Sequence, residues 1–295
     1  MKRVIYDLGA NNGDDIPYYL LKGDVVVAVE ANPDLCKQIS SRFKDDIESG
    51  RLILENCVIT AEQEKSEVVF YLHKENHVLS QLPRPDPSVI ENYVQINLPS
   101  KPVADIVNTH GSPFYIKIDI EHYDGPILQS LFRHNFYPPY ISAESHTINV
   151  FSILLAQGGY NAFKLVDGLS VSTVYADRII QCERTKDLIR YSFPYHSAGP
   201  FGGDIDGEWL TPDNFFRLLC FEGLGWKDIH ASNVETPNPL ARVSPYDYFE
   251  TLISREQILD YCRERNDILY DLVNPSSIIR STGSRVKNIF RRKTR

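Results

Sequence analysis

The stretch that decides the fold is residues 4–15, with the sequence VIYDLGANNGDD. An apolar run ends at Leu8, a loop carrying Gly9 and Gly13 follows, and a helical pattern begins at Asp14. Glycine lets the backbone approach a ligand closely, and the start of a helix presents N–H groups without partners inside the helix. The stretch therefore predicts a strand, a binding loop and a helix, the unit on which doubly wound sheets hold nucleotide-like ligands.

The glycine spacing of this loop argues against a dinucleotide. It reads Asp-x-Gly-x-x-x-Gly, whereas dinucleotide sites carry Gly-x-Gly-x-x-Gly. Asp7 stands two residues before the first glycine, where it would repel a pyrophosphate and suits a ligand with a cationic amine and sulfonium. A nicotinamide-dependent oxidoreductase is the alternative enzyme, and it predicts a third glycine near Asn11 and Asn12, which is absent.

A carboxylate ends the second predicted strand. Residues 25–29 (VVVAV) are continuously apolar, as expected for a strand covered on both faces, and Glu30 and Ala31 follow them. A carboxylate at this strand end can accept hydrogen bonds from both hydroxyls of a ribose. We therefore expect Glu30 to bind the ribose of a nucleotide-like cofactor.

The first half of the chain alternates apolar, strand-like runs with helical patterns. This alternation predicts an α/β fold with a doubly wound, mostly parallel sheet. The predicted strands are residues 3–8, 24–30, 52–58, 114–120, 140–144 and 162–166, with 67–73 as an antiparallel arm. The predicted helices are residues 14–21, 33–43, 124–134 and 149–157.

The remaining segments suggest a domain organisation. Residues 1–190 are predicted to form the cofactor-binding domain, with 81–103 as a lid loop because its five prolines cannot lie inside a sheet. Residues 191–250, rich in glycine and proline, are predicted to be an irregular cap over the acceptor, with 195–210 selecting it through an exposed Trp209. A Ser-x-x-Gln capping box opens a predicted C-terminal helix over 251–279, and 280–295 is expected to be a disordered basic tail.

A third motif, residues 114–125 (FYIKIDIEHYDG), carries charge along an apolar strand. Alternate side chains of a strand share a face, so Lys117, Asp119 and Glu121 point the same way. Three charges on one face of a buried strand cost free energy unless they end at a ligand or a partner. The motif therefore predicts a functional site at this strand end.

With residues 7–11 (DLGAN), 29–33 (VEANP) and 116–121 (IKIDIE), the chain resembles the FkbM-type S-adenosylmethionine-dependent methyltransferases over residues 1–167. The resemblance implies a class I (Rossmann-like) methyltransferase sheet that holds S-adenosyl-L-methionine across the carboxyl ends of its strands. It also implies methyl transfer to a hydroxyl, often on a sugar of a polysaccharide, glycolipid or natural product. His122 departs from the family, which usually has glycine there.

The resemblance assigns roles to individual residues of this chain. Asp7, Gly9 and Gly13 would lie near the methionine part of the cofactor, Glu30 on its ribose, and Asp119 near the reacting centre. The further expected cofactor neighbours are Asn11, Ala31 and, beside the adenine, Asn56.

The fifth predicted strand ends in Glu144 and His146, and the ends of strands four and five open into the same crevice. Asp119, Glu121, Glu144 and His146 are therefore the candidate catalytic residues. Asp119, Glu144 and His146 would suit Mg²⁺ or Mn²⁺, which would polarise the acceptor hydroxyl in a manner similar to the catechol-type O-methyltransferases. The metal-free alternative uses His146 or Glu121 as a general base.

Composition limits the partners and the location. The chain carries 31 Lys and Arg against 39 Asp and Glu, for a net charge of −8, and residues 280–295 hold seven basic residues and no acid. The acidic body predicts no nucleic-acid partner, whereas the tail could contact an anionic membrane or polymer peripherally. No apolar run exceeds five residues and no signal-peptide pattern is present, so we expect a cytoplasmic protein. The expected partner is a carbohydrate acceptor, and the non-enzymatic alternative is a glycan-binding protein on a degenerate methyltransferase fold.

Overall fold

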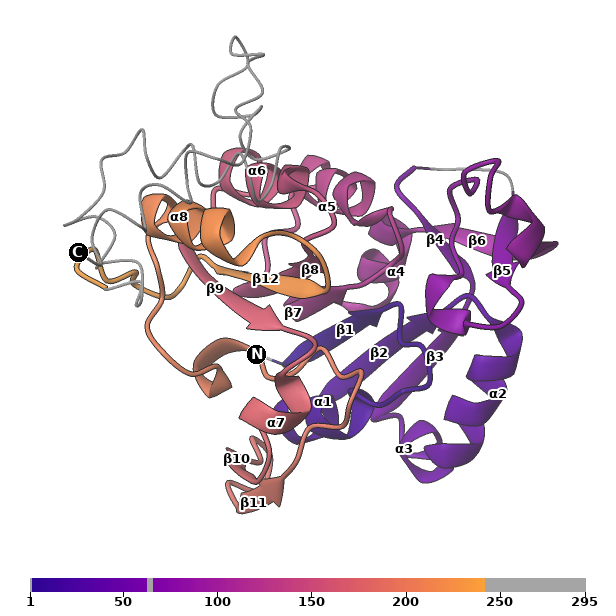
Figure 1. Ribbon diagram of the computed structural model, residues 1–295. Coiled ribbons are helices and arrows are strands. Elements are labelled where there is room, and N and C mark those ends of the chain that lie inside the picture. The colour runs from indigo at the N-terminus through magenta and orange to yellow at the C-terminus, as the bar shows by residue number, and fades with distance from the viewer. Residues whose placement is uncertain (1, 63–65, 242–295) are drawn as a thin grey trace, which may run out of the picture.

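A seven-stranded sheet forms the centre of the computed structural model, which describes residues 2–62 and 66–241 (Figure 1). Its strands, in spatial order, are β3 (Leu52–Asn56), β2 (Val25–Glu30), β1 (Val4–Leu8), β7 (Pro113–Ile118), β8 (Tyr140–Glu144), β12 (Lys227–Ser232) and β9 (Ala162–Asp167). The pairs from β3 to β8 are parallel, and β12 runs antiparallel to both of its neighbours. The doubly wound, mostly parallel sheet predicted from the sequence is confirmed.

Helices cover both faces of the sheet because its strands are apolar on both sides. Tyr6 and Leu8 of β1 pack with α4 (Val103–His110), α5 (Asp124–Arg133), α6 (Ile148–Ala156) and α8 (Pro212–Glu222). Ile5, the alternate residue, packs on the other face with α1 (Ile16–Lys22), α2 (Pro33–Arg42) and α7 (Val171–Val174). The two cores explain why β1 and β2 are buried at every position.

A smaller three-stranded sheet lies beside the main one, in the order β4 (Val58–Thr60), β6 (Tyr93–Pro102), β5 (Glu67–His73). β5 pairs antiparallel with β6, so the predicted antiparallel arm at 67–73 is confirmed. The other short elements are α3 (Lys44–Glu48), β10 (Arg178–Gln181), β11 (Leu188–Tyr191) and the 3₁₀ turns η1 (His77–Leu79), η2 (Ile90–Asn92) and η3 (Gly202–Asp204).

The prediction of a loop over residues 81–103 was wrong for its second half, which forms β6. Pro99 pairs with Glu67 at the last position of the antiparallel ladder, and Pro102 pairs with Thr60 at the last position of the parallel one. A proline at the end of a ladder removes an N–H that the ladder does not need. The two prolines therefore end the strand pairings without breaking the sheet.

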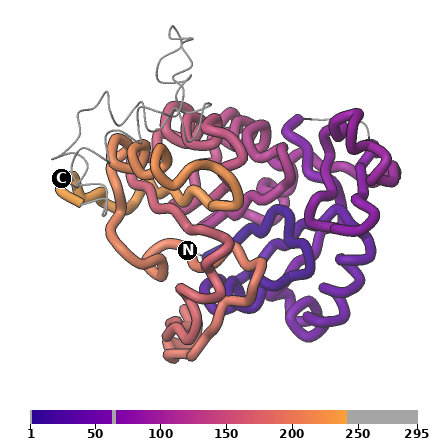
Figure 2. Tube along the Cα trace, viewed as in Figure 1, coloured from indigo at the N-terminus to yellow at the C-terminus, as the bar shows by residue number. Residues whose placement is uncertain are grey.

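The prediction of an irregular segment over 191–250 was also wrong in part, because it contains α8 and β12. β12 lies between β8 and β9, and Figure 2 shows the late, orange part of the chain returning to the middle of the molecule. Trp209, expected to be exposed, is buried, with the ammonium group of Lys164 5.0 Å from its ring centre. The first half of the segment is largely irregular, as expected.

The predicted C-terminal helix at 251–279, the basic tail at 280–295 and the end of the 191–250 segment lie outside the described residues. Over residues 2–62 and 66–241, no helix combines the length and the apolar character needed to cross a membrane.

Candidate active site

The carboxyl ends of β1, β2, β7 and β8 surround a cavity of about 470 Å³. This is the edge at which doubly wound sheets bind their ligands. The sequence-predicted residues that line it are Gly9, Asn11, Glu30, Ala31, Asp119, Glu121, Glu144 and His146. The topology therefore brings the three motifs and the end of the fifth predicted strand to one site.

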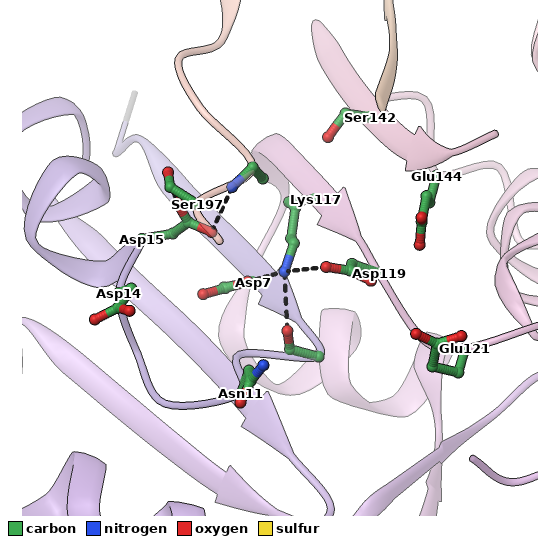
Figure 3. A network of polar contacts seen from close by, with 12 residues as sticks. Asp7, Asn11, Asp14, Asp15, Lys117, Asp119, Glu121, Ser142, Glu144 and Ser197 are labelled. Atoms are coloured by element: carbon green, nitrogen blue, oxygen red, sulfur yellow. Dashed lines mark hydrogen bonds and ion pairs between the residues drawn. The ribbon is translucent and has the colours of Figure 1, made fainter. Parts of the chain in front are cut away.

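Lys117 ties two of these strand ends together (Figure 3). Its side chain is 4% exposed, and its Nζ lies 3.3 Å from Asp7 Oδ1 and 3.2 Å from Asp119 Oδ2. The same ammonium donates a hydrogen bond of 2.9 Å to the carbonyl oxygen of Gly9. Burial on its own would lower the pKa of Lys117, but Asp119 and Asp7 raise it well above its usual value. Asp7 is fully buried, and neither Asp7 nor Lys117 is among the described residues that line the cavity. Asp7, expected beside the methionine part of the cofactor, therefore lies behind the cavity wall in this structure.

Replacing Lys117 by Met is expected to destabilise the protein by about 3–5 kcal/mol, since removal of one partner leaves a buried, uncompensated charge on Asp7. The free energy of unfolding from urea titration measures the loss. Lys101→Met is the matched control, because the Lys101–Glu55 pair of 2.6 Å is half exposed at the lysine and should contribute about 1 kcal/mol or less. Equal losses in the two variants would contradict the buried role of Lys117.

Gly9 allows the loop after β1 to approach the end of β7. Its φ is +87°, and a Cβ at this position would lie 1.9 Å from the carbonyl oxygen of Asp119. Gly13, with φ of +81°, has a different surrounding, because a Cβ there would meet Ile39 and Phe43 at 3.1 Å. The structure thus places Gly9 in the wall of the cavity and Gly13 in the packing behind it.

Glu30 forms one end of the cavity. Its carboxylate accepts hydrogen bonds from the backbone N–H groups of Asn11, at 2.8 Å, and Asn32, at 2.7 Å. Burial raises the pKa of Glu30 to about 7 against the opposing effect of these bonds. Asn56 supports this end from outside, because its side-chain amide donates to the carbonyl oxygens of Glu30 and Ala31 while its neighbour Cys57 lines the cavity.

The other end of the cavity holds an imidazole between carboxylates. His146 Nε2 lies 2.8 Å from Glu144 Oε2 and 3.6 Å from Glu121 Oε2. Burial on its own would lower the pKa of His146, but Glu144 and Glu121 raise it to about 9. Burial raises the pKa of Glu121 to about 7, and the charges of Asp119 and Glu144 add to the rise. At neutral pH, His146 therefore holds its proton, whereas Glu121 can accept one.

A family model described as the methyltransferase FkbM domain matches residues 7–158, just over half of the chain. The chain belongs to this methyltransferase family. The structure is also similar to the precorrin-6y C5,15-methyltransferase of Geobacter metallireducens, with 12% identity, 65% of this chain and 75% of that chain covered, and a TM-score of 0.33. A second similar structure is TrmK of M. capricolum in complex with S-adenosyl-homocysteine, with 10% identity, 98% and 87% covered, and a TM-score of 0.35. No curated protein matches the sequence.

As an FkbM-family methyltransferase, the chain has the class I methyltransferase fold and depends on S-adenosylmethionine. Its cavity fits that cofactor. Asn11 Oδ1 is buried and has no hydrogen-bond partner among the described residues, so it is left for a ligand donor. Apolar side chains line the cavity together with Glu30, as an adenine ring requires: Leu35, Val58, Ile59, Phe70 and Leu79. Carboxylates at the opposite end favour a cationic ligand.

The structure groups the possible metal ligands differently from the predicted set of Asp119, Glu144 and His146. Asp119 pairs with the ammonium of Lys117, which opposes a cation at that carboxylate. Among the described residues, the donor atoms of Glu121, His122 and His146 all lie within 4.8 Å of one another. His122 adopts a φ of +61°, in the left-handed region that few residues other than glycine occupy.

Among the lining residues of this methyltransferase cavity that the sequence analysis did not single out are Gly225 and Trp226, whereas His196 belongs to the predicted acceptor segment at 195–210. The rings of His196 and Trp226 stack, with centroids 5.4 Å apart. Trp226 reaches the site because the start of β12 adjoins the end of β8, where the N–H of Ser145 donates to the carbonyl of Lys227. No local pattern could have indicated this, since the contact depends on the pairing of distant strands.

Most of the predicted acceptor cap, residues 195–210, lies away from the cavity. Among these residues, His196 lines the described cavity, whereas Phe201 and Ile205 pack in the core with α1. Ser197 and the N–H of Ala198 donate hydrogen bonds to the buried Asp15. This segment therefore anchors the first helix more than it covers the site.

Proposed function

We propose that this FkbM-family methyltransferase transfers the methyl group of S-adenosylmethionine to a hydroxyl of a sugar, in a polysaccharide, a glycolipid or a glycosylated natural product. The observation that carries the proposal is that Glu30 and Glu121 line the same cavity. Glu30, which is suited to bind a ribose, and Glu121, which is suited to accept a proton, therefore face the same bound molecules. The family match replaces the alternative of a nicotinamide-dependent oxidoreductase.

The residues of the cavity would have different roles in the reaction. When bound, S-adenosylmethionine supplies a methyl group on a positively charged sulfur. Glu30 and Asn11 would hold its ribose and neighbouring polar atoms, and the carboxylate of Asp119 would stabilise its positive charge. These contacts fix the position of the methyl group, which contributes much of the rate of an in-line displacement.

Glu121 would accept the proton of the acceptor hydroxyl. As the hydroxyl oxygen bonds to the methyl carbon, the electron pair of the broken carbon–sulfur bond moves to sulfur and the proton moves to the Glu121 carboxylate. A general base is most effective when its pKa lies near the working pH, and burial raises the pKa of Glu121 to about 7. His146, protonated beside Glu144, can donate a hydrogen bond that orients the acceptor oxygen.

Calorimetric titration with S-adenosylhomocysteine tests the cofactor role of Glu30. We expect the parent protein to bind and Glu30→Gln to bind about 10- to 100-fold more weakly, because it loses hydrogen bonds to a charged group worth about 1.5–3 kcal/mol. Glu48→Gln, at an exposed position of α3, should bind as the parent protein does.

Failure of the parent protein to bind S-adenosylhomocysteine would overturn the proposed function and favour the non-catalytic glycan-binding alternative. Binding that Glu30→Gln leaves unchanged would overturn the role of Glu30 alone.

A further inference from the structure

A second cavity, of about 530 Å³, lies between α5 and α6, two neighbouring helices on one face of the sheet (Figure 1). Two residues, His122 and His146, line both this cavity and the cofactor cavity. Because His146 stands 3.6 Å from the Glu121 carboxylate, the second cavity opens next to the proposed base. A molecule held between α5 and α6 would therefore meet the methyl donor at these two imidazoles.

The lining of the second cavity suits a ligand rich in hydroxyl groups. Its polar side chains include Gln129, Asn149, Ser152 and Gln157. Amides and hydroxyls both donate and accept hydrogen bonds, as do the hydroxyls of a sugar ring. Apart from the two histidines, Asp124 is its one titratable lining residue among those described.

Asp124 is an unusual residue in this lining. It is 2% exposed, yet neither carboxylate oxygen has a hydrogen-bond partner among the described residues. A buried polar group without a partner costs roughly 1–3 kcal/mol, so most such groups in folded proteins are paired. Asp124 also lines the second cavity, where a hydroxyl of a bound molecule would be a suitable partner for this carboxyl.

The backbone of His122, which lies between the two cavities, adopts an uncommon conformation. His122 holds a φ of +61°, and its ring centre lies 4.8 Å from that of His146. Backbone conformations of this kind persist where the surrounding structure requires them, often at binding sites. Here the conformation places an imidazole between the two cavities.

We propose that the cavity between α5 and α6 is the acceptor subsite and takes a neutral sugar ring, with Asp124 accepting a hydrogen bond from one of its hydroxyls. The inference rests on the proposed methyl transfer, since it names where the acceptor of that reaction binds. The ring lies against Gln129, Asn149 and Ser152, and one hydroxyl reaches past His122 and His146 toward Glu121.

Saturation-transfer NMR with the protein loaded with S-adenosylhomocysteine tests this subsite. The probes are the methyl glycosides of glucose, galactose, mannose and rhamnose at millimolar concentration. We expect at least one to receive saturation, and Ser152→Trp to reduce that signal about tenfold, because the exposed Ser152 points a substituent into the cavity without disturbing a core. Asn108→Trp, at an exposed position of α4 outside both cavities, is the control and should keep the signal.

A second variant separates binding from folding. Asp124→Ala removes an unpartnered carboxyl, so we expect it to fold with unchanged or higher stability and to lose the sugar signal about tenfold. A stability loss with the sugar signal retained would assign Asp124 a structural role and overturn the proposal. The proposal also fails if no glycoside binds, or if Ser152→Trp keeps the signal. In either case, binding of S-adenosylhomocysteine by the parent protein would leave the proposed methyltransferase function standing.

Discussion

Glu121→Gln is expected to lower kcat by about 100- to 10,000-fold, the range over which a positioned general base contributes to a reaction. The amide keeps the size of the carboxylate but cannot take the proton of the acceptor hydroxyl. Affinity for S-adenosylhomocysteine should stay within about threefold of the parent protein, since Glu30 and Asn11 hold the other end of the cavity. The measurement is methyl transfer from radiolabelled S-adenosylmethionine to the glycoside that gives the strongest NMR signal.

The pH dependence of kcat in the parent enzyme should reflect the titration of Glu121. Burial raises the pKa of Glu121 to about 7, and only the deprotonated form accepts a proton, so kcat should rise with pH and level off above about 7. Glu91→Gln, on the exposed turn η2, should keep both the rate and this profile. If Glu121→Gln retains more than about a tenth of the parent kcat, the base is another group.

Gly9→Ala is expected to be the most disruptive single-methyl change in the cavity wall. The new Cβ would lie 1.9 Å from the carbonyl oxygen of Asp119, and that contact is with backbone, which cannot turn aside. We expect a loss of about 3–5 kcal/mol in the free energy of unfolding, at the high end for a point substitution. Titration with S-adenosylhomocysteine should show binding weakened by more than about tenfold, because the two strand ends must separate.

Gly50→Ala is the control that separates two effects at Gly9: the clash of a new Cβ with Asp119, and the cost of a side chain in the left-handed backbone conformation. Gly50 has a φ of +71°, close to that of Gly9, but no described atom lies within 4 Å of a Cβ built there. Its alanine variant should lose only about 1–2 kcal/mol, the cost of the left-handed conformation alone. Similar losses at the two positions would mean that the close approach of Gly9 to Asp119 does not matter.

The buried parallel strands were the part of the fold that the sequence predicted best. Residues 25–29 are apolar without interruption because β2 is covered on both faces, and β8 spans the predicted residues 140–144. Both cases reflect local burial, which leaves its mark on every residue of the strand. The ends of these strands then located Glu30 and Glu144.

β12 could not be predicted in the same way. Its sequence, KDIHAS, carries Asp228 and His230, which read as surface residues although both are buried in the sheet. Burial lowers the pKa of His230 to about 3, so this imidazole stays neutral inside the fold. A strand whose polar residues are buried gives no apolar pattern, and its position followed only from its pairing with β8 and β9.

The candidate site, like the fold, could be predicted from the sequence only in part. The acidic residues at strand ends could be expected to converge, but their individual roles depend on side-chain neighbours that spacing does not specify. Lys117 pairs with Asp7 and Asp119, and Glu144 holds the pKa of His146 above its usual value, which leaves Glu121 as the proposed base. Trp226 reaches the site through the pairing of distant strands, and the cavity beside Asp124 depends on how α5 and α6 pack against each other.

The place of β12 in the sheet also bears on how the protein is made. The central sheet lacks a strand between β8 and β9 until residue 232 has left the ribosome, long after β1, β2 and β7 have been synthesised. Because the amino-terminal strands are synthesised first, we expect the cofactor-binding strands to assemble before this insertion. Until β12 pairs with them, β8 and β9 each have one edge whose backbone N–H and C=O groups lack the partners that β12 provides in the folded protein.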